Sequence, residues 1–232
     1  MGLLLQITTA ATDTMAAGTT ALPVEDTFSL WDLTLKGGPI MIPIALCSLI
    51  AVYIIIERYF AIRKASKNDP NFMNNIRDFI SNGNITSARS LCKNTESPVA
   101  RMIERGVSRI GKPLSDIEKA IENIGNIEIV KLEKGLSLLA TVAGAAPMLG
   151  FLGTVTGMIK AFYNMSKAGK TIDISLLSGG MYEAMVTTVA GLIVGIFALV
   201  AYNLLSAMVE QMVFKMETTS IEFMDLLQEP AR

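Results

Sequence analysis

Three long stretches without a charged residue constrain the fold of this chain more than any other feature. They cover residues 37–56, 135–159 and 184–209. About 20 apolar residues suffice for a helix to cross the hydrocarbon core of a bilayer, and each stretch reaches that length. Because a membrane segment must satisfy its own backbone hydrogen bonds, each stretch is predicted to be helical. We therefore expect an all-α integral membrane protein with three transmembrane helices.

The distribution of basic residues predicts the orientation in the membrane. Residues 57–134 carry 14 of the 20 lysines and arginines. Loops rich in Lys and Arg stay in the cytoplasm, which puts the N-terminus and the link between spans two and three outside. The predicted organisation is a periplasmic tail 1–36, transmembrane helix 37–60, cytoplasmic helical region 61–134, transmembrane helix 135–162, periplasmic link 163–182, transmembrane helix 183–209 and cytoplasmic C-terminal helix 210–232.

Hydrophobic periodicity extends the second and third spans beyond the bilayer. Four helices are expected in the cytoplasmic region, beginning near Phe72, Thr86, Pro98 and Ser115. The helix that begins at Ser115 is predicted to run as one rod to Asn164, and the third span to run on to about Leu227. Two such rods would form a helical stalk in the cytoplasm. The alternative is separate helices with a bend at the membrane interface.

Small residues form one continuous face on each of these two spans. Lipid gives no hydrophobic drive for helix association, so close packing of small side chains takes its place. Both faces repeat at alternating intervals of three and four residues. They comprise Ala143, Ala146, Gly150, Gly153 and Gly157 in the second span, and Ala184, Thr188, Gly191, Gly195 and Ala198 in the third. We predict tight packing through Ala146, Gly150, Gly153, Gly157, Gly191 and Gly195, within the chain or between copies of it.

Polar residues near these faces are candidates for a proton pathway. Thr154 and Thr188 lie on or beside the small faces, where facing hydroxyls would line a narrow hydrated path. The alternative is that each bonds to a carbonyl of its own helical turn. Glu183 is expected at the outer end of the third span, one turn before Thr187, either facing the small face or as a solvated acid at the helix start.

Composition excludes several classes of function. The net charge of −1 gives no reason to expect nucleic acid as a partner, and histidine is absent. Cys47 and Cys92 lack metal-ligand spacing. Without a nucleophile–base pair, a phosphate loop or a metal cluster, we expect neither an enzyme nor a bound cofactor or metal. Ion-driven transport generally needs a titratable group inside the membrane, and the three apolar stretches contain no Asp, Glu, Lys, Arg or His.

Two segments carry a family resemblance. APMLGFLGTVTGMIKAF (146–162), followed by EAMVTTVAGLIVGIFALVAYN (183–203), resembles the paired signature of the MotA/TolQ/ExbB proton-channel superfamily. IERY (56–59) is similar to the end of the first span in its ExbB and TolQ members. The long N-terminal extension favours ExbB over TolQ.

The resemblance implies a homopentamer in the bacterial inner membrane around a dimer of a single-span ExbD/TolR-like partner. That partner carries an intramembrane Asp opposite Thr154 and Thr188, and Glu183 matches the family's acid before the third span. The pentamer and the dimer rotate against each other as protons pass, and the motion reaches the outer membrane through a TonB-like protein. The alternatives are a TolQ-like envelope-maintenance subunit and a non-conducting oligomeric scaffold.

Overall fold

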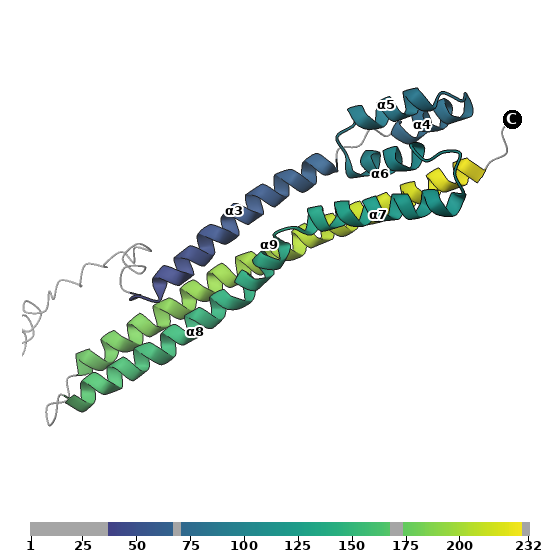
Figure 1. Cartoon of the computed structure of the whole chain (residues 1–232). Coiled ribbons are helices and arrows are strands. Elements are labelled where there is room, and N and C mark those ends of the chain that lie inside the picture. Colours follow the sequence, from purple (N-terminus) through teal and green to yellow (C-terminus); the bar gives the residue numbers. More distant parts are fainter. Residues whose placement is uncertain (1–36, 67–70, 168–173, 229–232) are drawn as a thin grey trace, which may run out of the picture. The chain divides into compact units, whose positions relative to one another are not determined.

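The computed structural model describes residues 37–66, 71–167 and 174–228 (Figure 1). The predicted tail 1–36 lies outside the described residues, as does the middle of the link between spans two and three. The described residues contain α-helices and connecting turns, with no strand. Three helices are long and apolar enough to cross a membrane, which confirms the predicted all-α fold with three membrane helices.

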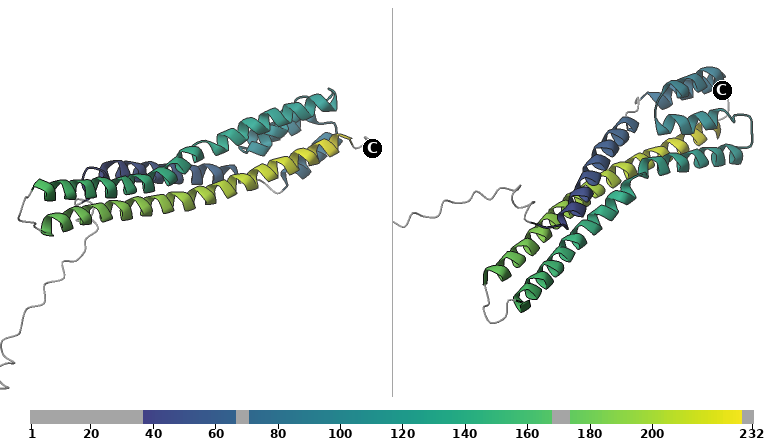
Figure 2. Two further views of the ribbon diagram at one scale, coloured as in Figure 1. Left: turned by 90° about the horizontal axis from the view of Figure 1, so that it is seen from below. Right: turned by 60° about the vertical axis from the view of Figure 1, so that its left-hand side comes forward.

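Three helices form the membrane part. They are α3 (Met41–Ala65), α8 (Leu136–Lys167) and α9 (Ile174–Gln228). Helices α8 and α9 have the most extensive contact of any two described helices. Figure 2 shows the two helices running side by side. Helix α3 packs against both of them, and its apolar side chains Ile42, Leu49 and Tyr53 remain exposed, as expected of a helix that faces lipid.

The charged region between the first two spans folds into four helices, in agreement with the sequence prediction. They are α4 (Phe72–Ser81), α5 (Ile85–Asn94), α6 (Pro98–Val107) and α7 (Leu114–Glu133). Local signals start two of them. Asn84 accepts a hydrogen bond from the amide of Ser87, and Ser97 accepts one from the amide of Ala100 and is followed by Pro98 at the first helical position. Both arrangements satisfy amides that the helix itself leaves free.

A stalk forms where α6 and α7 pack on the C-terminal half of α9. Gly106 of α6 lies at its centre, because an added Cβ there would approach Phe223 of α9 to 2.6 Å and Ile121 of α7 to 2.8 Å. Ile103 and Met216 are also buried in this core. Helix α9 continues without interruption for 55 residues from the membrane into the stalk, as predicted for the third span.

The predicted single rod from Ser115 to Asn164 is wrong. Helix α7 ends at Glu133, and α8 begins at Leu136. Between them, Gly135 has a φ of 85°. Glycine has no Cβ and takes this left-handed conformation without the steric penalty that other residues pay, so the chain can end one helix and begin another here. The alternative of two helices with a break at the interface describes this part of the chain.

Candidate functional site

The small faces of α8 and α9 meet along one seam. A Cβ added to Gly191 of α9 would lie 2.6 Å from the carbonyl oxygen of Ala146 and 2.9 Å from the Cα of Gly150. Real side chains do not approach that closely, so these positions admit only hydrogen. Because glycine has no side chain, the two backbones come into direct contact. Such close packing holds helices together in lipid, where there is no hydrophobic drive for their association.

The same seam continues toward the loop between the two helices. A Cβ on Gly153 would overlap the side chain of Thr187, and one on Gly157 would lie 2.9 Å from the Cβ of Ala184. At the other end, Gly195 faces Pro147 and the carbonyl of Ala143. The six residues predicted to pack closely, Ala146, Gly150, Gly153, Gly157, Gly191 and Gly195, therefore all lie at the α8–α9 seam.

Thr188 joins the two helices by a hydrogen bond. Its hydroxyl donates to the carbonyl of Gly150 at 3.0 Å and lies 3.5 Å from the carbonyl of Ala184 in its own helix. Thr154 differs, because its hydroxyl donates to Phe151 of its own helix at 2.6 Å. The two hydroxyls predicted to face each other are thus engaged with separate carbonyls. Both side chains are half-buried.

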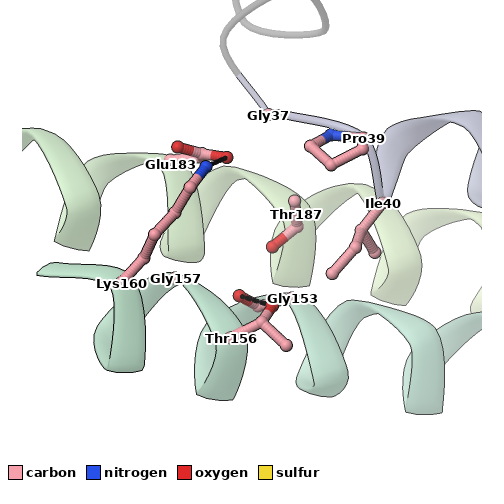
Figure 3. A pocket seen from close by; sticks show the side chains of 9 residues that line it. All are labelled: Gly37, Pro39, Ile40, Gly153, Thr156, Gly157, Lys160, Glu183 and Thr187. Carbon is pink, nitrogen blue, oxygen red and sulfur yellow. Dashed lines mark hydrogen bonds and ion pairs between the residues drawn. The ribbon is translucent and has the colours of Figure 1, made fainter. Parts of the chain in front are cut away.

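Glu183 lies at a cavity of about 250 Å³ at the loop end of the seam (Figure 3). Lys160 of α8 extends toward it, with 3.8 Å between Nζ and Oε1. The glutamate side chain is 29% exposed and the lysine side chain 63%. Gly153, Gly157, Thr156 and Thr187 line the cavity from α8 and α9, while Gly37, Pro39 and Ile40 line it from the start of the first span.

Comparison with known proteins gives the family. Residues 94–218 match the model of the MotA/TolQ/ExbB proton channel family, and this range is more than half of the chain. The chain belongs to the MotA/TolQ/ExbB proton channel family. The match spans α6 to most of α9, so it includes the whole α8–α9 seam.

Relatives named ExbB support the same assignment. The ExbB-like 1 biopolymer transport protein of Synechocystis sp. is 30% identical over 188 residues, which cover 78% of this chain and 72% of the relative. The ExbB protein of Neisseria meningitidis serogroup B is 26% identical over 189 residues, covering 74% and 84%. An ExbB homologue of Methanothermobacter thermautotrophicus is 26% identical, covering 78% and 64%. This member of the family is therefore a membrane protein similar to ExbB-type biopolymer transport proteins.

Two residues of the site were not among the predicted pathway residues. Thr187 is buried, donates its hydroxyl to the carbonyl of Ala184 at 2.7 Å and packs on Gly153. Its spacing of four residues from Glu183 was a usable signal, because such residues share a helix face. Lys160 directly follows the second uncharged stretch in the sequence. Its pairing with Glu183 depends on how α8 and α9 are aligned with each other, and the sequence of either helix does not specify that alignment.

The cavity combines charged and hydroxyl groups within a largely apolar protein. A carboxylate, an ammonium group and the hydroxyls of Thr156 and Thr187 surround a space large enough for several water molecules, each of which occupies about 30 Å³ in the liquid. Such a site can hold hydrogen-bonded water at one end of the seam. Among the described residues, no group of His, Cys, Asp or Glu is arranged to hold a metal ion.

Proposed function

We propose that this chain is the channel subunit of an ExbB-type motor. In this proposal, several copies, five on the family pattern, surround a dimer of a single-span ExbD/TolR-like partner in a bacterial inner membrane. The complex couples proton flow to outer-membrane transport through a TonB-like protein. The family membership and the ExbB names of the relatives support this proposal over a TolQ-like role in envelope maintenance.

The observation that carries the proposal is the α8–α9 seam, which offers hydroxyls but no carboxylate within the apolar spans. Thr188 bonds across the seam, and Glu183 lies at one end of it. Residues 135–159 and 184–209 contain no Asp, Glu, His, Lys or Arg that could take up and release a proton near neutral pH. A proton pathway along these helices therefore needs an acid supplied by a partner, and an intramembrane Asp is the group that the family provides.

Energetics favours such a coupling. One elementary charge that crosses 100 mV releases about 2.3 kcal/mol. A few protons therefore supply several kcal/mol that is available as mechanical work. In the proposed orientation, the N-terminus is periplasmic, and α4 to α7 and the end of α9 are cytoplasmic, because the basic residues gather there. Glu183 and Lys160 then lie near the periplasmic end of the membrane.

The test is the replacement of Thr188 by Val in cells that depend on this complex for energised uptake. Valine keeps the shape but removes the hydroxyl, so we expect the complex to assemble on native gels while uptake is lost. Thr188→Ser restores a hydroxyl and should restore uptake. Thr141 is the matched control, since its hydroxyl bonds only within α8 at an exposed position and Thr141→Val should leave uptake unchanged.

Two outcomes would contradict the proposal. If Thr188→Val assembles and supports uptake at the wild-type rate, the hydroxyl has no role in proton passage. If the complex assembles but carries no proton current in vesicles together with its single-span partner, the chain is a scaffold. Co-purification of a partner from the Tol system instead of a TonB-like protein would favour the TolQ-like alternative.

A further inference from the structure

A second cavity lies away from the seam, among the stalk helices. It has a volume of about 320 Å³ and is bordered by α5, α6 and α7. Its charged lining consists of Arg89, Arg101, Glu104, Arg105, Glu128 and Lys131. Four cationic side chains thus face two carboxylates, and the cavity carries an excess of positive charge. The proton pathway proposed above does not use any of these residues.

Internal pairing leaves part of this positive charge free. The Glu128 side chain is only 4% exposed and accepts hydrogen bonds from Arg101 at 2.5 Å and from Lys131 at 2.7 Å. Glu104 lies 3.8 Å from Arg89. Arg105 is exposed and makes no ion pair with any residue that the structure describes. A guanidinium has five N–H donors and an ammonium three, so donors remain for a ligand with several acceptor oxygens.

The depth of the cavity indicates where such a ligand comes from. Arg58 is the second residue after the apolar stretch of the first span. Its guanidinium donates a hydrogen bond to the backbone carbonyl of Lys131. Lys131 therefore lies at the boundary of the hydrocarbon. Glu128 is three residues further along α7, about 4.5 Å along the helix axis. The headgroup layer on each side of a bilayer is about 5–8 Å thick. The end of the cavity at Lys131 and Glu128 thus lies at headgroup depth, and the cavity continues to Ile124, about 10.5 Å from Lys131 along the same axis.

Apolar side chains extend from the cavity toward the membrane. Ile127 lines the cavity and is half-exposed. Val130 of α7 is 67% exposed, and Leu138 of α8, on the membrane side of the break at Gly135, is 51% exposed. A free phosphate would leave these side chains unused. A molecule with a phosphate group and hydrocarbon chains would contact both the basic lining and the apolar residues.

We propose that this cavity binds the phosphate headgroup of an anionic phospholipid, with Arg105 and Arg101 as its main ligands. Basic pockets next to the cytoplasmic ends of membrane helices favour such headgroups because that leaflet carries negative charge. Glu128 holds Arg101 and Lys131 in place, and Arg105 supplies the charge that no carboxylate of the described chain neutralises. The acyl chains lie toward Val130 and Leu138.

The test uses the purified full chain in a neutral detergent, freed of bound lipid. Phosphatidylglycerol, phosphatidylcholine and inorganic phosphate are titrated separately, and binding is followed by native mass spectrometry. We expect phosphatidylglycerol to bind to the wild type and Arg105→Gln to weaken that binding about tenfold, as expected for the loss of one charged contact. Arg63 is the matched control, because it is basic and close to the same membrane boundary but does not line the cavity.

The outcomes separate the possible ligands. Weaker phosphatidylglycerol binding in Arg105→Gln, with wild-type binding in Arg63→Gln, supports the proposal. Equal loss in both variants, or equal binding of phosphatidylcholine, shows general surface attraction and overturns it. Equally tight binding of inorganic phosphate also overturns it, since the ligand is then not a lipid. If the assembled oligomer excludes phosphatidylglycerol while the separated chain binds it, a neighbouring copy occupies the cavity and the proposal fails.

Arg105 is exposed, so its variant should fold, and an unchanged melting temperature without lipid checks this.

Discussion

The guanidinium of Arg58 donates a hydrogen bond to the backbone carbonyl of Lys131 across 3.3 Å. This contact joins the first membrane helix to the last turn of α7, just before the break at Gly135. The carbonyls of a last helical turn have no partner within the helix and carry its negative dipole end, so a cation placed there stabilises it. Arg58 also pairs with Glu57 at 2.8 Å and is almost fully buried.

Arg58→Ala should therefore destabilise the junction between α7 and α8. The change leaves a carbonyl without its partner and opens a space beside Gly135, whose added Cβ would lie 3.4 Å from the Nε of Arg58. We expect a loss of about 1–3 kcal/mol in the free energy of unfolding. Thermal unfolding in detergent and limited proteolysis near residue 134 measure the effect. Arg63→Ala is the control, because among the described residues the Arg63 guanidinium interacts only with Tyr59, through its ring and its hydroxyl. Equal stability of the two variants would show that Arg58 does not hold the junction.

Gly191→Leu should separate α8 from α9. Any side chain at Gly191 collides with the carbonyl of Ala146, and backbone atoms cannot move aside as a flexible side chain can. We expect the oligomer band on native gels to disappear. The free energy of unfolding should fall by about 1–3 kcal/mol or more, the usual cost of overpacking. Gly144→Leu is the matched control in α8, since no described atom outside the adjacent turns of its own helix lies within 4 Å of an added Cβ there. Normal assembly of Gly191→Leu would remove the packing role of the seam.

The membrane helices and the junction between them differ in how far the sequence could predict them. A bilayer excludes charge, so the length of the uncharged stretches was enough to predict three membrane helices. The small faces of α8 and α9 followed from spacing alone. The break at Gly135 could not be predicted in this way, because Gly135 is also the first residue of an apolar stretch. In the folded chain, side chains of another helix, Arg58 and Ile54, lie close to Gly135, and the sequence does not show this contact. The partner of the Thr188 hydroxyl likewise depends on the register of two helices.

Cys92 should resist thiol reagents in the folded protein. Burial, with a smaller contribution from the charge of Glu104, raises the pKa of Cys92 from 9.0 to about 12. At pH 8 only about one molecule in ten thousand then carries the reactive thiolate. In a Cys47→Ala background, we expect maleimide to label the folded chain about a thousandfold more slowly than the chain unfolded in detergent, because the thiolate fraction at pH 8 falls from about one in ten to about one in ten thousand.

The control for this experiment is an exposed position on the same helix. Ser90→Cys, in a chain without Cys47 and Cys92, should be labelled quickly in the folded state. The raised pKa also predicts that stability falls as the pH rises from about 9 toward 12, because the unfolded thiol ionises first and the folded one does not. Fast labelling of folded Cys92 would contradict its burial.

Glu128 should make the stalk sensitive to acid. Burial raises the pKa of Glu128, but hydrogen bonds from Arg101 and Lys131 outweigh this effect and hold the pKa below its ordinary value of 4.5. The ionised carboxylate therefore stabilises the folded chain above pH 4.5, and this contribution is lost as the pH falls through the lower pKa of the folded state. Glu128→Gln should lower the free energy of unfolding by about 1–3 kcal/mol at neutral pH, with a difference from the wild type that shrinks on acidification.

Thermal unfolding in detergent between about pH 7 and about pH 3 measures both effects. Glu118→Gln, at an exposed position on the same helix without an ion pair to any described residue, should differ little from the wild type at any pH. A difference for Glu128→Gln that stays constant across this range would show that its carboxylate is not bound as an anion.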